Sequence, residues 1–156
     1  MPRLRHAGAA VFCALTLTAC LGTTPPEKPP VARIQIEGQK KLNPTASGES
    51  TPVVVKLFAL RRGAKFRNAD FFGLYDNPEK TLGSDIVSSE QVTIRPKETV
   101  SRTWVLDPGT NYLGALAAFR NIDQSRWSTV TKIERNKKTT RYNLLVGSKK
   151  IEISKK

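Results

Sequence analysis

Apolar and polar residues alternate along much of the chain, which predicts β-strands that are buried on one face. In the first such segment Ala32, Ile34 and Ile36 alternate with polar residues, and a period of two places the three apolar side chains together. Seven or eight segments of this kind, with a turn about every ten residues, predict an all-β fold: a two-sheet antiparallel β-sandwich. The expected strands cover residues 31–37, 53–60, 92–94, 99–106, 112–119, 127–133, 140–146 and 151–153.

Four other segments refine this picture. Residues 53–60 are apolar at nearly every position, so we expect a central strand there. Residues 64–75 repeat apolar groups at spacings of three and four, which predicts one or two short helices crossing the end of the sheet. Residues 95–98 separate two strands and are expected to form a hairpin turn. Residues 38–51 form a long polar loop, which in a compact domain is either mobile or functional.

The N-terminus carries an export signal. Arg3 and Arg5 precede an apolar run over residues 7–17, which is long enough for a signal peptide and too short to span a bilayer of about 30 Å. The sequence Leu-Thr-Ala-Cys that ends at Cys20 matches the bacterial lipoprotein pattern, in which the cysteine becomes lipid-modified. We therefore expect residues 1–19 to be removed. The alternatives are lipidation at Cys13, which the bulky Phe12 disfavours, and an ordinary secreted protein in which Cys20 has no special role.

The mature chain is expected to have two parts. Residues 20–30 are the lipidated cysteine and a tether whose four prolines favour an extended polyproline II conformation. Residues 31–156 are the β-sandwich domain. Two or three acyl chains on Cys20 would hold the protein stably on a membrane. Leu21 is not the acidic residue that commonly retains lipoproteins at the inner membrane, so we expect an outer-membrane protein that faces the periplasm.

Composition excludes most catalytic chemistry. Beyond residue 19 there are 24 Lys and Arg against 13 Asp and Glu, a single Cys, and no His or Met. These residues provide no imidazole base, no Cys–His pair, no disulfide and no zinc site of the usual kind. We expect no enzyme, no cofactor and no metal. Export also removes nucleic acid as a ligand, so the positive charge is expected to be solvated or to meet anionic lipid, acidic glycan or an acidic protein face.

A set of short motifs runs in order through nearly all of the mature chain. They are the lipoprotein box ending at Cys20, then residues 42–44, 52–60, 66, 69–72, 74, 81–85, 95–99, 112–114, 117–120 and 127. Through this ordered set the chain resembles the TssJ family of type VI secretion lipoproteins. The resemblance implies a transthyretin-like β-sandwich with a small helical insertion. It also implies an outer-membrane anchor for the membrane complex of the secretion machine, oligomeric only within that complex.

The resemblance further implies a partner and a binding loop. In the family, the lipoprotein binds the periplasmic region of TssM, which lies in the inner membrane with TssL, and the loop between the first two strands contributes to the contact. In this chain that loop is residues 39–50, and the expected contacts are Lys40, Lys41, Leu42, Asn43, Pro44 and Thr45. The alternative function is a periplasmic lipoprotein that binds an acidic envelope ligand or glycan, which would explain the positive charge without a protein partner.

Overall fold

The computed structural model of the chain describes residues 29–134 and 139–156. The predicted signal peptide (1–19), Cys20 and most of the predicted tether (20–30) lie outside the described residues. The elements in chain order are β1 (Val31–Gly38), β2 (Val53–Leu60), α1 (Ala64–Asn68), α2 (Phe71–Asp76), α3 (Pro78–Leu82), β3 (Ile86–Ile94), β4 (Thr99–Val105), β5 (Tyr112–Ala117), β6 (Ser128–Lys132), β7 (Thr139–Val146) and β8 (Ile151–Lys155). Short 3₁₀ turns lie at Gly83–Asp85 and Ile122–Gln124.

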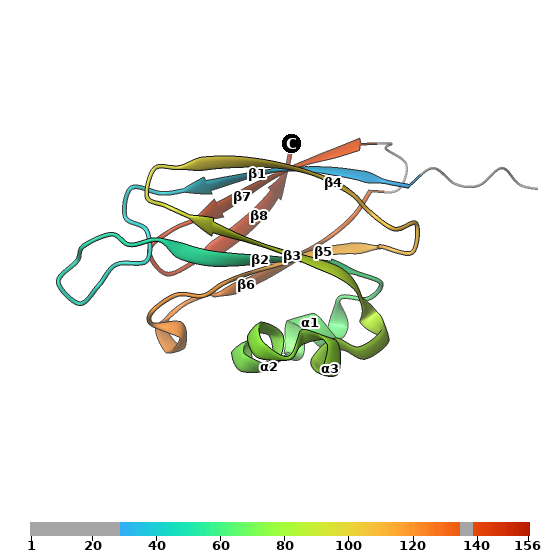
Figure 1. Cartoon of the computed structure of the whole chain (residues 1–156), viewed down its shortest axis with the longest axis horizontal. Coiled ribbons are helices and arrows are strands. Elements are labelled where there is room, and N and C mark those ends of the chain that lie inside the picture. The colour runs from blue at the N-terminus through green and yellow to red at the C-terminus, as the bar shows by residue number, and fades with distance from the viewer. Residues whose placement is uncertain (1–28, 135–138) are drawn as a thin grey trace, which may run out of the picture.

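The strands form two four-stranded sheets that pack face to face (Figure 1), which confirms the predicted β-sandwich. Sheet A has the order β4-β1-β7-β8, and sheet B has the order β3-β2-β5-β6. Neighbouring strands run antiparallel except β1 and β7, which run parallel. As a result β1 is an inner strand of sheet A, hydrogen-bonded along both of its edges.

The core lies between the two sheets and is built from the inward positions of the alternating segments. Ile34 and Ile36 of β1 face Val55 and Leu57 of β2 in this core, and all four side chains are buried. Burial of each such side chain contributes about 1.5–3 kcal/mol relative to an exposed one. The predicted central position of residues 53–60 is confirmed, because β2 pairs with β3 on one edge and β5 on the other.

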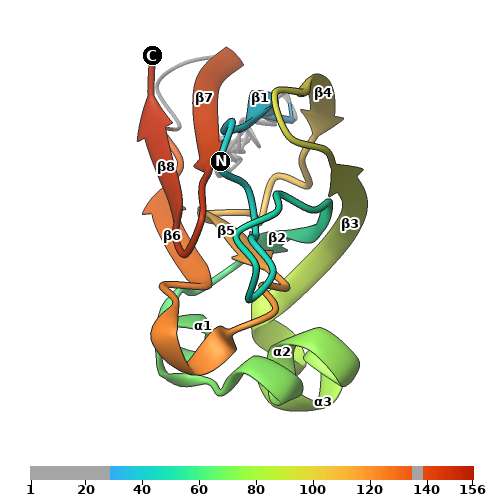
Figure 2. The same ribbon diagram turned by 90° about the vertical axis from the view of Figure 1, so that its left-hand side faces the viewer.

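The helical insertion covers the outer face of sheet B, and it does not cross the end of the sheet as we expected (Figures 1 and 2). Phe58 and Leu60 of β2 point to this outer face and pack against Phe66, Leu74 and Leu82 of the three helices. Strand β2 is therefore buried on both faces, which explains why its sequence lacks alternation. None of the helices in the described ranges has the length and apolar character needed to cross a membrane.

The prediction of a hairpin at residues 95–98 is wrong. Strand β3 pairs with β2 in sheet B, whereas β4 pairs with β1 in sheet A, so this turn crosses from one sheet to the other. The turn bonds instead to the end of β1, where the Lys97 nitrogen donates to the Gly38 carbonyl at 2.9 Å. Only glycine permits this approach, because a Cβ at Gly38 would lie 2.4 Å from the Arg95 carbonyl oxygen. Strand β3 also begins at Ile86 rather than at residue 92.

The two ends of the sandwich carry different parts of the chain. Strand β1 begins at the end where the described chain starts, and it runs to the opposite end. Four connections meet at that opposite end: residues 39–52, 95–98, 118–127 and 147–150 (Figure 2). The N-terminal side of the domain and the predicted partner-binding loop are therefore separated by the length of a strand.

Candidate partner-binding surface

The four connections at the far end of the sandwich form one continuous surface, which we call the loop platform (residues 39–52, 95–98, 118–127 and 147–150). Each connection is hydrogen-bonded to another part of this end of the domain, although the four are far apart in the sequence. The linking bonds are Lys97 N to Gly38 O (2.9 Å), Asn43 N to Gly147 O (3.4 Å), Arg120 N to Asn43 Oδ1 (2.8 Å) and Arg126 N to Lys149 O (2.8 Å). The platform is therefore a shaped surface rather than four independent loops.

The structure separates the six predicted contact residues into two groups. Lys40 and Lys41 are exposed, and Pro44 and Thr45 are half-buried at the surface of the platform. Leu42 is 0% exposed and Asn43 is 5% exposed. The Leu42 side chain fills the end of the hydrophobic core between the sheets. In this structure Leu42 and Asn43 do not reach the surface, so their side chains shape the loop instead of presenting a contact.

Asn43 is the polar centre of the platform. Its Nδ2 donates to the Pro52 carbonyl at 2.9 Å and to the Thr51 hydroxyl at 3.1 Å, and its Oδ1 accepts from the Arg120 nitrogen at 2.8 Å. The Thr51 hydroxyl in turn donates to the Asn43 carbonyl at 2.6 Å. The backbone φ at Asn43 is 41°, a left-handed conformation that asparagine tolerates better than most residues. One side chain thus joins both ends of the loop to the connection after β5.

The outer part of the same loop is closed by its own bonds. The Thr45 nitrogen donates to the Glu49 carbonyl at 2.8 Å, and the Gly48 nitrogen donates to the Thr45 carbonyl at 3.0 Å. Gly48 has φ 84°, which favours glycine at this turn. The Ser50 hydroxyl donates to the Lys40 carbonyl at 2.9 Å. The long loop predicted from the sequence is therefore folded back on itself and is hydrogen-bonded from base to tip.

The platform is strongly basic. Its residues include eight Lys and Arg but three Asp and Glu. Lys40, Lys41 and Lys97 form no ion pair with any residue that the structure describes. Exposed cations without local partners raise the positive potential over a surface, which attracts an acidic ligand and discriminates against a basic one.

A groove of about 540 Å³ crosses the platform beside the tip of the loop. It combines the apolar atoms of Pro44 and Ile122 with the polar side chains of Arg120 and Lys149. The Lys149 ammonium donates to the Gln124 amide oxygen at 3.0 Å, which fixes one wall. A shallow groove with mixed lining suits a protein segment better than a small reactant. Within the described ranges, no group of three or more Asp, Glu, Cys or His is placed to hold a metal ion.

Sequence reasoning did not place the residues from the second half of the chain in this surface. Arg120 and Lys149 lie in connections that read as ordinary turns, and only the strand topology brings them beside residues 44–46. The basic pair Lys40 and Lys41 lies in the loop that the family resemblance implies as the contact, and that loop also differs from the other connections by its length.

A family model matches most of this chain. The model T6SS-SciN, described as type VI secretion lipoprotein with the member names VasD, EvfM and TssJ, matches residues 30–153. No curated relative matches the chain at the level of sequence.

Solved structures match as well. The chain is similar to the lipoprotein TssJ1 of Pseudomonas aeruginosa at 31% identity, with a TM-score of 0.78 over 82% of this chain and 97% of that chain. It is also similar to Lip of Serratia marcescens, a membrane-bound component of the type VI secretion system, at 19% identity and TM-score 0.75, covering 80% and 96% of the two chains. A chain of a type VI membrane complex matches at 22% identity and TM-score 0.71, covering 81% and 99%.

Proposed function

Because the chain belongs to the family of type VI secretion lipoproteins that includes TssJ, we propose that it anchors the membrane complex of that secretion system to the outer membrane. In this proposal, lipid on Cys20 inserts into the outer membrane, and the loop platform binds the periplasmic region of TssM. TssM itself is anchored in the inner membrane together with TssL. The protein acts as an adaptor, and neither attachment needs a catalytic group. The single observation that carries the proposal is that β1 begins at one end of the sandwich and the loop platform lies at the other.

The arrangement of the ends supports an adaptor. Strand β1 spans eight residues from Val31 to Gly38. At about 3.3 Å per residue its two ends lie roughly 26 Å apart. The predicted tether, residues 20–30, leads into the start of β1, and the platform begins directly after its end. A partner on the platform is thus held away from the lipid-bearing side, where a membrane would exclude it.

The internal bonds of the platform support a protein contact. A loop that is ordered before it binds loses less conformational entropy in the complex. The buried side chains of Leu42 and Asn43 hold the loop in its shape. The side chains that a partner would contact are those of Lys40, Lys41 and Thr45. We therefore assign the exposed residues to the contact, and we assign the two buried residues to the shape of the loop.

The charge of the platform sets the expected partner chemistry. Because the platform has eight basic and three acidic residues, we expect the face of TssM that binds it to be acidic. Charge pairs at the rim of an interface mainly affect the association rate and the salt dependence of binding, whereas the groove lined by Pro44 and Ile122 offers apolar area at the centre.

Binding of the described domain (residues 29–156) to the TssM periplasmic region tests the platform. We expect Lys40→Glu with Lys41→Glu to raise the dissociation constant about tenfold or more at low salt, because each reversal opposes an acidic face. The matched control is Lys80→Glu with Lys132→Glu, which changes the charge equally at two exposed positions away from the platform. Equal affinities of the two double variants would place the interface elsewhere.

The anchor is tested separately in cells. Cys20→Ser removes the acylated thiol and leaves residues 29–156 intact, so we expect a folded protein that fractionates with the soluble periplasm and no longer supports secretion. Mass spectrometry of the wild-type protein should find acyl chains on Cys20. Full secretion by the variant would overturn the proposed anchoring, whatever the platform binds.

A further inference from the structure

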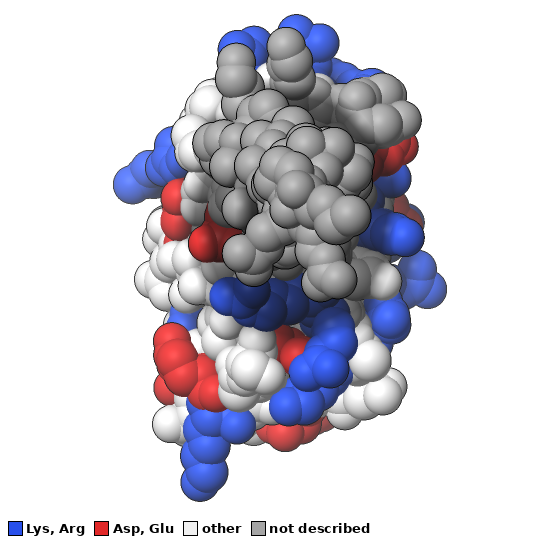
Figure 3. Space-filling view, turned by 90° about the vertical axis from the view of Figure 1, so that its right-hand side faces the viewer, with Lys and Arg blue, Asp and Glu red and all other residues white. Residues whose placement is uncertain are grey.

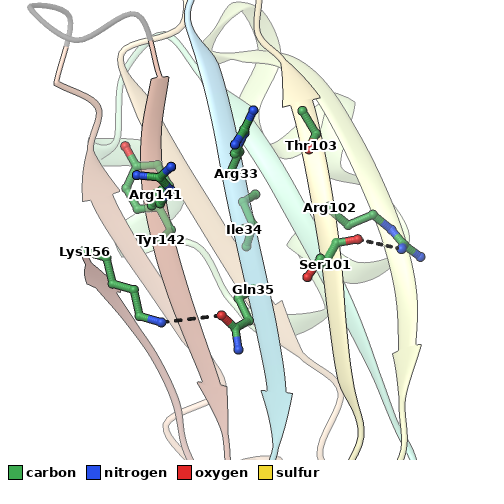
Figure 4. Close-up of a pocket in the computed structure, with 9 residues that line it drawn as sticks. All are labelled: Arg33, Ile34, Gln35, Ser101, Arg102, Thr103, Arg141, Tyr142 and Lys156. Carbon is green, nitrogen blue, oxygen red and sulfur yellow. Dashed lines mark hydrogen bonds between the residues drawn. The ribbon is translucent and has the colours of Figure 1, made fainter.

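The outer face of sheet A carries a second basic surface at the opposite end from the platform. Helices cover the outer face of sheet B but leave this face of sheet A open (Figures 1 and 2). The strand register places Arg33 of β1 directly beside Arg141 of β7, with Thr103 of β4 on the other side of Arg33. Figure 4 shows these side chains on adjacent strands of the same face.

Further hydrogen-bond donors surround the two arginines. The Lys156 nitrogen donates to the Arg141 carbonyl at 3.0 Å, and the Lys156 ammonium lies 3.5 Å from the Gln35 amide oxygen (Figure 4). Together with Thr103 these residues border a shallow hollow of about 220 Å³, and no acidic residue is among those that line it. Arg102, Ser101 and the apolar side chain of Ile34 line the same hollow, which is therefore rich in cations and hydroxyls but not wholly polar.

Among the residues that the structure describes, the two arginines have no partner of opposite charge. Neither Arg33 nor Arg141 forms an ion pair with a residue in the described ranges. Like charges on directly paired strand positions destabilise a sheet, and a bound anion would relieve that repulsion. The planar guanidinium group donates two parallel hydrogen bonds to phosphate or carboxylate, which makes a pair of arginines better suited to an oxyanion than scattered lysines.

The position of this surface argues for a membrane. Arg33 and Arg141 are each the third residue of their strand, and β1 and β7 run parallel, so both lie near the end where β1 begins. Figure 3 views the molecule from this end, and Lys and Arg side chains appear on several sides of it. This is also the end at which the predicted tether enters the domain.

We propose that Arg33 and Arg141, assisted by Lys156, bind the phosphate of an anionic lipid headgroup in the membrane that carries the anchor. The inference rests on the proposed lipid anchoring, because the tether is what brings this face near a bilayer. Acyl chains alone fix only one point of the protein, whereas a second, electrostatic contact fixes its orientation. The platform would then be held in a defined direction relative to the membrane.

Vesicle binding by the unlipidated domain (residues 29–156) tests this proposal independently of Cys20. The probe is vesicles of phosphatidylcholine in which a third of the lipid is phosphatidylglycerol, at low salt, with pure phosphatidylcholine as the uncharged comparison. We expect Arg33→Gln with Arg141→Gln to weaken binding roughly 30-fold, since each basic residue near an anionic surface contributes about fivefold. The matched control, Lys80→Gln with Lys132→Gln, removes the same charge from exposed positions outside the hollow, and it should weaken binding much less.

The outcomes separate the possible ligands. Equal losses in both double variants would show attraction by net charge alone and would overturn the site. Shifts of the Arg33 and Arg141 resonances with inorganic phosphate, without vesicle binding, would assign the hollow to a free phosphate and overturn the lipid proposal. Unchanged vesicle binding with lost TssM binding in the arginine variant would assign this face to the protein partner. An unacylated Cys20 in cells would overturn the anchoring while leaving the vesicle result standing.

Discussion

At the scale of single residues, Asn43 decides how the platform is built. Its amide bonds to Pro52 and Thr51 across the loop and to the Arg120 nitrogen, which is 77 positions away in the sequence. Without these side-chain bonds the loop would keep its turn bonds, the bond from the Asn43 nitrogen to the Gly147 carbonyl and the buried Leu42, but it would lose its link to the Arg120 nitrogen. The residue that most controls the shape of the platform is therefore buried beneath it.

Asn43→Ala should destabilise the domain and the platform together. The substitution removes three hydrogen bonds made by an amide that is 5% exposed, and each such bond contributes about 0.5–1.5 kcal/mol. We expect urea unfolding to show this loss, and TssM binding to weaken although Lys40 and Lys41 are intact. Ser47→Ala at the exposed tip of the same loop is the control and should change the free energy of unfolding by less than about 0.5 kcal/mol. Equal stability of the two variants would show that the Asn43 bonds are not needed.

Tyr142 is expected to make the free energy of unfolding depend on pH in the alkaline range. The side chain is 1% exposed. Burial raises the pKa of the Tyr142 phenol above 10.0 because the phenolate would lose its hydration; the Thr140 hydroxyl opposes this shift and Glu134 adds to it. The folded state therefore holds the proton more tightly than the unfolded chain does. The resulting stabilisation is complete below about pH 10 and is lost as the pH rises through the folded pKa.

Tyr142→Phe should remove this response while keeping the ring in the core. In urea unfolding we expect the wild type and the variant to respond alike up to about pH 10, and the wild type to lose more stability as the pH rises above that value. The comparison between the two proteins cancels the titration of the lysines, which both share. Parallel curves over this range would mean that Tyr142 does not ionise differently on unfolding.

At the scale of elements, the insertion between β2 and β3 acts as a cover for sheet B. Phe66 is 1% exposed and packs against Phe58 with ring centroids 5.3 Å apart. Phe66 also lies against Gly114, where a Cβ would come within 3.0 Å of the ring. Two sheets and one short helical segment thus make three layers, and β2 in the middle layer is the strand that is apolar at nearly every position.

Phe66→Ala should cost about 3–5 kcal/mol of unfolding free energy, because it leaves a cavity between α1 and sheet B. Phe72→Ala in the neighbouring helix is the matched control, since Phe72 is 60% exposed and its truncation opens no cavity. Denaturant unfolding of both variants measures the difference. Similar losses would show that α1 is not packed on the sheet as described.

The fold class was predictable from local pattern, and the pairing of strands was not. Alternation identified most strands, and the nearly continuous apolar run identified β2, because the burial of a strand is visible in the residue pattern of that strand alone. Residues 95–98 would have the same composition whether they joined two paired strands or two strands of different sheets. What ties this turn to sheet A is the bond from Lys97 to Gly38, a residue far from it in the sequence. The ordered motifs gave the family, and that resemblance is confirmed.

The candidate surface was predictable only in part for a similar reason. The loop with Lys40 and Lys41 stood out by length, charge and family resemblance, and all its residues are contiguous. Burial of Leu42 and Asn43 depends on strands that end beside them, and Arg120 joins the surface through the topology of sheet B. Neither effect has a local signature.

At the scale of the whole molecule, positive charge lies at both ends of the sandwich. The platform presents Lys40 and Lys41, and the outer face of sheet A presents Arg33 and Arg141 near the other end. In the proposed arrangement the two ends meet different acidic ligands, so that neither contact blocks the other.

Salt should therefore weaken both contacts without unfolding the domain. Raising the ionic strength from about 0.1 M to about 1 M shortens the Debye length from about 10 Å to about 3 Å. We expect the dissociation constants for TssM and for anionic vesicles both to rise over this range. The urea midpoint should fall little if at all, since the core carries the stability. Salt-independent binding of both ligands would contradict a role for the exposed cations.

Strand β1 has a mechanical consequence. It lies between β4 and β7, with seven and eight paired residues respectively, and it connects the tether side to the platform. Tension between the two membranes would enter at Val31 and leave after Gly38, along the strand, so that both hydrogen-bonded ladders would be sheared at once rather than opened one bond at a time. Pulling residue 29 against residue 47 should accordingly need more force to rupture the fold than pulling residue 29 against residue 156. In the proposed adaptor, a domain loaded in this direction would transmit tension between the two membranes while keeping its own shape.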